Sequence, residues 1–363
     1  MAINNDGYLR PVGNLDNNLP QGCPAYKVQV IPTVDYDSIW GNVKESYKGY
    51  AKDEKTRRMG SSGGAITSIL QGVLGNNYVD RVIVTTYDKQ NPLKNVTKIV
   101  TCVNDLINYS GSRYSPSSPL DVLPEIIDDD HTYAFVGKPC DVAALKGYIK
   151  DNPALEKKFK LTISFFCAGI PSTKASAELV EKLGFELDQV KELRYRGDGW
   201  PGLAKVRTFD GKENSMTYQE SWGNILNKQL QKRCKLCADG TGELADISCA
   251  DVWDESENGY PSFEEKDGFS LIICRNQRGA EIIQSIDTLV YETYPLVNLR
   301  KIQPYQYQRK TTIYLRNNVL KLFLKDTVCY QGFGLKKLHE CHSVKFKVKS
   351  YISTIKRVLK GRL

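Results

Sequence analysis

Two stretches decide the fold: Tyr133-Ala-Phe-Val-Gly-Lys-Pro-Cys140 and Leu161-Thr-Ile-Ser-Phe-Phe-Cys167. Each is a short apolar run that ends at a cysteine, and a helix-forming segment follows each run. Arg81–Tyr87 is a third run of this kind, and the apolar spacing over 66–74 predicts a helix before it. This alternation predicts a mixed α/β fold, a central sheet with flanking helices, whose loops gather at the carboxyl ends of the strands.

Around this core the 363 residues divide into four predicted parts. Residues 1–55 are rich in Asn, Gly and Pro and predict an extended lead-in, and residues 56–190 form the α/β region. Beyond about residue 190 the sequence turns to loops, so 191–315 is predicted as a loop-rich, cysteine-containing C-terminal catalytic region with a strand at Ser270–Cys274. Residues 316–363 are predicted as a basic, amphipathic tail.

Composition excludes several classes of protein. Hydrophobic residues make up 41% and charged residues 25%, which is ordinary for a globular chain and excludes a disordered one. No run approaches the ~18 apolar residues that a membrane-spanning helix needs, and the N-terminus lacks the apolar core of a secretory signal. We therefore expect a cytoplasmic protein.

The net charge of +8 is concentrated at one end of the chain. Residues 300–363 carry 16 Lys and Arg against 2 Asp and Glu, so the rest of the chain is mildly acidic. An acidic body without a recognised nucleic-acid-binding module predicts no nucleic acid partner. Apolar residues recur at helical spacing in the tail, and a cationic amphipathic helix of this kind is typical of a helix that lies on an anionic membrane surface. The tail therefore predicts a peripheral position on the inner membrane face, with an ordinary surface helix as the alternative.

The ten cysteines point to metal or redox chemistry, because disulfides are rare in a reducing cytosol. Cys234-Lys-Leu-Cys237 is a C-x-x-C motif that fits zinc, an iron–sulfur cluster or a redox dithiol. A redox dithiol of the thioredoxin type opens a helix after a strand, and here the motif lies in a loop. Cys140 and Cys167 end neighbouring predicted strands, so their thiols would meet at one sheet edge within reach of this motif. Four thiolates suit a [4Fe–4S] cluster or structural zinc.

Several blocks in a shared order resemble a known family. They are Gln21-Gly-Cys-Pro24, Arg58-Met-Gly-Ser-Ser-Gly-Gly64, Gly111-Ser-Arg-Tyr114, Val136-Gly-Lys-Pro-Cys140, Phe166-Cys167, Arg196-Gly-Asp-Gly-Trp-Pro-Gly202, Arg233-Cys-x-x-Cys-x-Asp239 and Ala245-Asp-Ile-Ser248. The chain resembles the coenzyme F420 hydrogenase/dehydrogenase beta subunit family, flavin and iron–sulfur oxidoreductases that include 7-hydroxymethyl chlorophyll a reductase. It is most similar to the bacterial members associated with polysaccharide biosynthesis.

The resemblance implies two cofactors, FAD and at least one [4Fe–4S] cluster. It implies that the cluster is held by Cys140, Cys167, Cys234 and Cys237. It also implies that the flavin lies near Ser61, Ser62, Gly63, Gly64, Arg113, Gly137 and Lys138. A Ser-Ser-Gly-Gly sequence that opens a helix can present backbone N–H groups and hydroxyls to an anion, although it is also what a capped helix needs. Arg57, Arg58 and Arg113 could clamp a pyrophosphate through their forked donors.

Two departures from the family pattern matter for the partners. Only Gly22-Cys23-Pro24 remains of the N-terminal ferredoxin module that many relatives carry, so an external one-electron donor such as a ferredoxin is implied. After Ala245-Asp-Ile-Ser248 the chain reads Cys249-Ala-Asp251 where a Gly-Asp is expected, and whether Cys23 or Cys249 ligates a second cluster is left open. Asp198, Trp200, Asp246 and Asp251 are candidates for the substrate side of the site.

The predicted function is electron transfer between a one-electron donor, a [4Fe–4S] cluster, FAD and a small-molecule substrate. The resemblance favours a sugar-linked substrate in surface polysaccharide biosynthesis. One alternative is a coenzyme F420 reductase or dehydrogenase. The other is a non-enzymatic binding or scaffold protein in which zinc occupies the same four cysteines.

Overall fold

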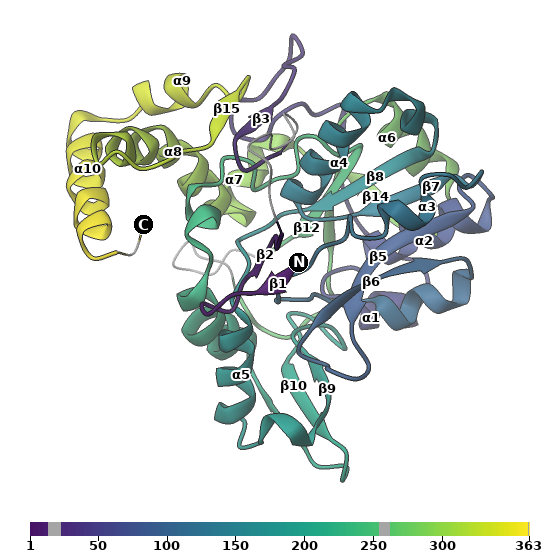
Figure 1. The fold of residues 1–363 in the computed structure, drawn as a ribbon. Coiled ribbons are helices and arrows are strands. Elements are labelled where there is room, and N and C mark those ends of the chain that lie inside the picture. Colours follow the sequence, from purple (N-terminus) through teal and green to yellow (C-terminus); the bar gives the residue numbers. More distant parts are fainter. Residues whose placement is uncertain (14–22, 254–261, 362) are drawn as a thin grey trace.

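The computed structural model describes residues 1–13, 23–253, 262–361 and 363. Its centre is an eight-stranded sheet in the order β14-β4-β13-β12-β8-β7-β5-β6 (Figure 1). The strands are β4 (Glu45–Ala51), β5 (Arg81–Tyr87), β6 (Asn95–Val100), β7 (Tyr133–Val136), β8 (Phe159–Phe165), β12 (Ile247–Asp251), β13 (Ser270–Cys274) and β14 (Leu289–Thr293). Strands β5, β7, β8 and β12 run parallel, and β13 is antiparallel to both β12 and β4. The carboxyl ends of β4, β5, β7, β8 and β12 therefore share one sheet edge.

Helices cover both faces of this sheet because its strands are apolar on both sides. Val82 and Val84 of β5 face a core with α2 (Ala65–Gly75) and α6 (Gln277–Ser285), whereas Ile83 faces a core with α3 (Leu123–Ile126) and α4 (Pro139–Asp151). This alternation follows from the two-residue period of a strand. The prediction of a mixed α/β fold with a central sheet and flanking helices is confirmed.

The structure corrects the predicted lead-in. Strand β4 lies within residues 1–55 and is an inner strand of the central sheet, hydrogen-bonded to β13 and β14. The rest of that segment holds the hairpin β1 (Ala2–Ile3) and β2 (Leu9–Arg10), and β3 (Lys27–Gln29), which pairs with β15 (Cys329–Gln331). The sequence of β4 hides the strand because Glu, Lys and Gly interrupt its apolar alternation.

The prediction of loops after residue 190 is also wrong in part. Strands β9 (Val190–Arg194), β10 (Ala204–Thr208) and β11 (Glu213–Met216) form a three-stranded antiparallel sheet that projects from the body beside α5 (Thr173–Lys182) (Figure 1). The turn between β10 and β11 contains Asp210-Gly211, a dipeptide typical of hairpins. In β10 the alternate residues Ala204, Val206 and Thr208 are buried.

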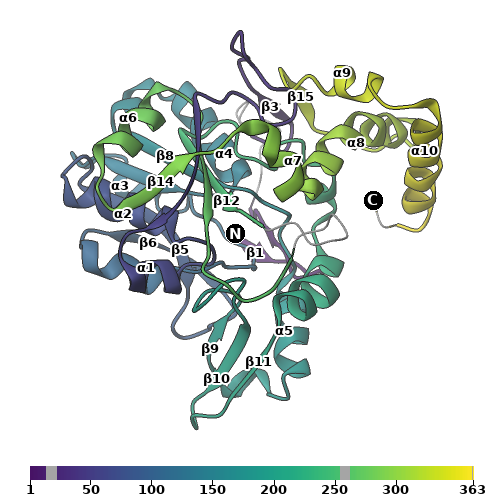
Figure 2. The same cartoon turned by 180° about the vertical axis from the view of Figure 1, so that it is seen from behind.

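The C-terminal segment is helical. It consists of α7 (Leu299–Ile302), α8 (Pro304–Leu322), α9 (Leu335–Glu340) and α10 (Val344–Leu359), and α10 stands at the outer edge of the molecule in both views (Figures 1 and 2). Helix α8 connects the C-terminal helices to the segment that carries the C-x-x-C motif, because it contacts both α10 and the short helical turn Lys232–Leu236. Among the described residues, no helix combines the length and the apolar character needed to cross a bilayer.

Candidate functional site

The predicted cysteines lie at the carboxyl edge of the sheet. Helix α4 begins at Pro139, directly after β7, so Cys140 lies in its first turn, and Cys167 follows the end of β8. Strands β7 and β8 are parallel neighbours, as predicted. The Cys167 N–H donates to the Gly240 carbonyl at 2.9 Å, and the Ile170 N–H contacts Cys234 Sγ at 3.4 Å. These contacts bring the segments that carry Cys140, Cys167 and the Cys234–Cys237 motif to one place.

The thiols share one electrostatic environment. Burial, together with the neighbouring Cys234 and Cys237, raises the pKa of Cys167 to about 12, while Arg309 acts to lower it. Burial likewise raises the pKa of Cys140, with a smaller contribution from Cys167. Across the described ranges, no three His, Cys, Asp or Glu side chains are arranged as a closed metal-binding set.

Cations surround the thiols. Arg233 lies beside Cys140 and Cys237, whose charges outweigh burial and raise its pKa. Arg309 of α8 donates to the Cys167 carbonyl, and its charge lowers the pKa of Cys237 against the effect of burial. Burial alone lowers the pKa of Lys138, but Asp141 and then Cys140 outweigh burial and raise it. Positive charge held close to buried cysteines favours their thiolate form, which is the form that binds metal.

Several buried polar atoms near the Cys234–Cys237 motif have no hydrogen-bond partner. They are Arg233 Nε, Asp239 Oδ2, Thr241 Oγ1 and Tyr330 OH. Leaving buried polar atoms unpaired costs free energy, so their concentration beside the thiols indicates a place where a further group is accommodated. Four soft sulfur donors with neighbouring arginines and no histidine fit a [4Fe–4S] cluster and also fit zinc.

A buried ion pair fixes the loop that follows the motif. Lys310 Nζ of α8 lies 2.5 Å from Glu243 Oε1, and both side chains are almost fully buried. The Tyr36 hydroxyl donates to Glu243 Oε2 at 2.7 Å. Asp239 accepts from the backbone N–H groups of Gly242 and Glu243. The loop from Cys237 to Glu243 is thereby held against α8 and the N-terminal segment.

The predicted flavin residues Ser61 to Gly64 lie at the start of α2, at the same sheet edge. Ser61 Oγ accepts from the Ser112 N–H, and Ser62 Oγ donates to the Phe269 carbonyl at 2.7 Å. Gly64 has φ of 73° and caps α2, whose first-turn N–H groups have no partner within the helix. Both hydroxyls are therefore engaged with the protein, and the backbone at the helix start is what this loop can offer to an anion.

Gly63 is required for close packing at this loop. An added Cβ would lie 2.7 Å from the Gly49 carbonyl oxygen and 2.8 Å from the Ser270 N, both backbone atoms of the sheet. We expect Gly63→Ala to lower the free energy of unfolding by about 1–3 kcal/mol through overpacking. Gly75→Ala, at the other end of α2, meets only Val103 at 3.8 Å and is expected to raise stability by about 0.5–1 kcal/mol. Urea denaturation of the cofactor-free chain measures both, and equal effects would contradict this assignment.

Arg113 is placed differently from the predicted pyrophosphate clamp. Its Nε donates to Asn95 Oδ1 at 2.9 Å, and its two terminal nitrogens each donate at 2.7 Å to the carbonyls of Leu193 and Pro92. In this arrangement all three nitrogens bind protein acceptors, and burial lowers the Arg113 pKa. Arg57 is also largely covered and stacks on Tyr50, whereas the Arg58 side chain is 69% exposed. Of these arginines, Arg58 is the one whose guanidinium remains accessible.

The remaining predicted flavin residues lie between β7 and α4. Gly137 leaves no room for a Cβ, which would lie 2.7 Å from the Phe135 ring and 2.8 Å from Asp141. Lys138 contacts Asp141 at 2.6 Å and Ser117 at 2.5 Å, and it is buried. Lys138 directly precedes the first turn of α4, which contains Cys140, and Cys140 and Cys167 both act on its pKa, so Lys138 lies next to the cysteines.

The Arg196–Gly202 loop is anchored by Asp251 at the end of β12. Arg196 makes a two-pronged contact with the Asp251 carboxylate at 2.8 and 3.0 Å, and Trp200 Nε1 donates to the same group at 3.0 Å. The Trp200 ring lies 4.8 Å from that of Trp253, and Arg196 stacks over the Tyr218 ring. The aromatic side chains of Trp200, Trp253 and Tyr218 therefore pack together beside the loop.

The acidic candidates for the substrate side are mostly engaged in the fold. Asp246 is 2% exposed and accepts from the backbone and side chain of Thr162 and from Asn276, so its role is structural. The Asp251 oxygens are occupied by Arg196 and Trp200. Asp198 is more accessible and pairs with Arg58 at 3.1 Å.

The other cysteines are spread through the fold. Cys249 and Cys274 are buried in the sheet core, and burial raises the pKa of Cys249. Cys23 lies one residue before Pro24, whose carbonyl accepts from Arg233, so the N-terminal segment reaches the cysteine site. Cys102, Cys329 and Cys341 are exposed.

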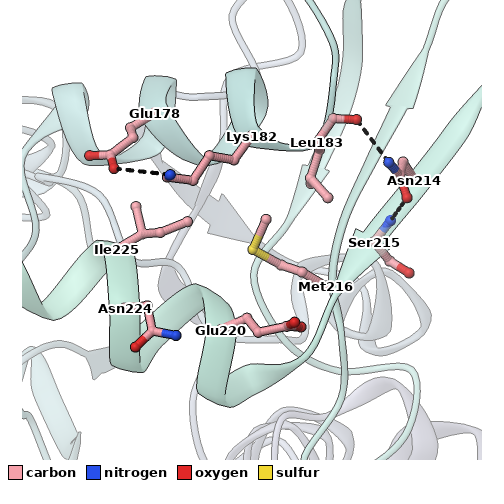
Figure 3. Close-up of a pocket in the computed structure, with 9 residues that line it drawn as sticks. All are labelled: Glu178, Lys182, Leu183, Asn214, Ser215, Met216, Glu220, Asn224 and Ile225. Carbon is pink, nitrogen blue, oxygen red and sulfur yellow. Dashed lines mark hydrogen bonds and ion pairs between the residues drawn. The ribbon is translucent and has the colours of Figure 1, made fainter.

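A separate groove of about 560 Å³ is lined by none of the cysteines and none of the predicted flavin residues (Figure 3). It is formed by α5, β11 and the helical segment Gln219–Ile225, with polar and apolar side chains mixed along its walls. None of the predicted site residues lines it.

Sequence reasoning missed Arg309 and the Arg196–Asp251 pair. Arg309 follows Cys167 by more than a hundred residues and carries no local signal. Arg196 and Asp251 are each prominent in the sequence, but nothing there indicates that they pair.

Comparison with known proteins shows the family of this chain. Two family models, for the N-terminal and C-terminal parts of the coenzyme F420 hydrogenase/dehydrogenase beta subunit, match residues 46–124 and 130–299 respectively. The chain belongs to this family. The match confirms the beta-subunit resemblance and supports a redox role, and it carries no information on the polysaccharide-associated type or the chlorophyll reductase.

Individual members of the beta-subunit family are distant from this chain. The coenzyme F420 hydrogenase subunit beta of Methanococcus voltae is 26% identical over 266 residues, covering 70% of this chain and 85% of that protein. The coenzyme F420-dependent sulfite reductase of Methanocaldococcus jannaschii is 24% identical over 327 residues, 84% of this chain but 47% of that protein. A chain of the F420-reducing [NiFe] hydrogenase complex from Methanosarcina barkeri has the same fold, with a TM-score of 0.61 at 20% identity over 80% of this chain and 97% of that one.

Proposed function

We propose that this chain is an iron–sulfur flavoprotein that transfers electrons between a one-electron donor protein and a deazaflavin substrate of the coenzyme F420 type. The observation that carries the proposal is the convergence of Cys140, Cys167 and the Cys234–Cys237 motif at the sheet edge that also holds the Ser61–Gly64 loop. The names of the relatives favour an F420-type substrate over a sugar-linked one.

Cys140, Cys167, Cys234 and Cys237 would hold a [4Fe–4S] cluster. Arg233 and Arg309 would offset the negative charge of the four thiolates, and Lys138, held cationic by Asp141, would add to that field. Electrostatic compensation of this kind tunes the reduction potential of a cluster. The Glu243–Lys310 pair would keep the Cys237 loop in position.

FAD would lie at the start of α2, with a phosphate against the backbone N–H groups of the first turn. The exposed Arg58 would neutralise its charge, whereas Arg113 would shape the neighbouring loop through its contacts to Asn95, Pro92 and Leu193. When bound, a cluster supplies single electrons and a flavin exchanges one or two, which matches a one-electron donor to a substrate that accepts two electrons with a proton. The donor would be a separate protein such as a ferredoxin.

Cofactor analysis and one activity measurement test this proposal. We expect chain purified without oxygen to contain iron, acid-labile sulfide and releasable FAD, and to oxidise or reduce coenzyme F420 when a one-electron donor or acceptor is supplied. Heat-denatured protein and free FAD are the controls.

The outcomes separate the alternatives. A colourless chain with stoichiometric zinc and no flavin would overturn the proposal. It would favour the non-enzymatic scaffold protein in which zinc occupies the four cysteines. A chain with both cofactors that is inactive with F420 but oxidises or reduces a sugar-linked substrate would overturn the substrate assignment and support the polysaccharide role.

A further inference from the structure

Part of the apolar surface of helix α10 is uncovered. Tyr351, Ile355 and Val358 pack on α8, whereas other apolar side chains of the helix are largely exposed, and Val348 among them also lines the edge of a groove against α8. The uncovered residues are Val344, Val348, Ile352 and Leu359, with exposed fractions of 75%, 53%, 49% and 71%. Their spacing of four, four and seven residues places them in one stripe along the helix.

Exposed lysines border this apolar stripe along its length. Lys345, Lys349, Lys356 and Lys360 lie next to it on the helical wheel and are exposed. On the other side the stripe adjoins the face that packs on α8, where Lys347 and His339 line a groove of about 180 Å³ between α8, α9 and α10. Residues 341–363 contain no Asp or Glu, so nothing in this segment neutralises the row. The occupant of the stripe must therefore be apolar where it meets the stripe and anionic along the row of lysines.

The composition of this surface favours a lipid bilayer over a protein partner. Protein interfaces are enriched in Trp, Tyr and Arg and depleted of Lys at their centres, whereas the polar side of α10 is dominated by Lys. A lysine-rich polar face opposite aliphatic residues is typical of helices that lie in the plane of a membrane surface. Helix α10 stands at the outer edge of the molecule (Figures 1 and 2), and the side chains of the stripe are 49–75% exposed.

We propose that α10 docks this protein on an anionic bilayer, with the apolar stripe at the level of the upper acyl chains and the bordering lysines against the lipid phosphates. The short reach of Val and Ile side chains limits insertion to the interface, and no described helix of the chain spans a membrane. The acidic body and the basic C-terminal region orient the protein with α10 toward the surface.

Vesicle sedimentation with the full-length, cofactor-loaded protein tests the proposal. We expect the protein to bind vesicles of phosphatidylcholine with phosphatidylglycerol and not vesicles of phosphatidylcholine alone, and to be released as salt rises. Each basic residue near an anionic surface strengthens binding roughly five-fold. The variant with Lys345, Lys349, Lys356 and Lys360 all replaced by Gln should therefore bind at least about tenfold more weakly. Val348→Ser with Ile352→Ser should also weaken binding several-fold.

A matched control replaces four exposed lysines elsewhere on the body. These are Lys150, Lys157, Lys174 and Lys191, and their replacement by Gln removes the same net charge. An equal loss of binding in this control, or binding to neutral vesicles, would contradict docking through α10. Failure of the wild-type chain to bind anionic vesicles would overturn the proposal, as would a dimer in solution that depends on Val348 and Ile352. Thermal unfolding of each variant verifies that the fold is retained.

Discussion

Replacing Cys237 by Ala is expected to remove the bound iron, because one of four thiolates is lost from a site that has no histidine to substitute for it. Loss of a supporting residue alone typically costs 10–100-fold in metal affinity, so loss of a ligand should lower iron and sulfide content by more than about tenfold. Iron and acid-labile sulfide per chain, measured after anaerobic reconstitution, give the result. Cys167→Ala should behave in the same way.

The control for this prediction is the exposed Cys102, which lies outside the converging segments. Cys102→Ala should keep the full iron content. Equal iron in the Cys237→Ala and wild-type chains would show that the motif does not hold the cluster. Unfolding temperatures of the iron-free chains separate loss of a ligand from loss of the fold.

A second large effect is expected from Lys310→Met, which leaves the Glu243 carboxylate buried without its partner. Breaking a buried ion pair from one side typically costs 3–5 kcal/mol, and we expect a loss of about this size in the free energy of unfolding. Denaturant unfolding of the full chain measures it. Lys336→Met is the matched control, because its 3.9 Å contact with Glu340 is exposed and worth only about 0–0.5 kcal/mol.

The loss in the Lys310→Met variant should depend on pH. Burial already raises the pKa of Glu243, with Lys310 acting to lower it, so removal of Lys310 raises the pKa further. Above the ordinary Glu pKa the folded variant then binds more protons than the unfolded chain, and its stability falls as pH rises. The difference from wild type should be largest at neutral pH and shrink as the solution is acidified through the raised Glu243 pKa. A pH-independent difference would contradict this origin.

The arrangement of the cysteines could be predicted because it follows from strand direction. Parallel neighbours bring their carboxyl ends to one edge, so Cys140 and Cys167 meet there whatever the detailed packing. The contacts of the arginines could not be predicted in the same way. Arg309 comes from a helix that is distant in the sequence. Arg113 resembles an anion ligand in the sequence, but its terminal nitrogens donate hydrogen bonds to backbone carbonyl groups.

The errors in the predicted fold have local causes. Asp210-Gly211 is a hairpin signal, but the polar residues around it obscure the strands on either side and favour a prediction of loops. Strand β4 contains no β-branched residue and owes its position to pairing with β13 and β14, which no local pattern encodes. Tertiary pairing of this kind overrides strand propensity.

The place of β4 between β13 and β14 has a consequence for how the protein is made. The strand leaves the ribosome early, but both of its neighbours are synthesised more than two hundred residues later. Until then β4 has no partner strand, and unpaired strands of this kind are prone to aggregate when left unprotected. Both family-matched segments contribute strands to the central sheet. An expression fragment that ends near residue 125 would lack β13 and β14 and would leave β4 without a partner strand. We therefore expect stable production to need the chain through β14.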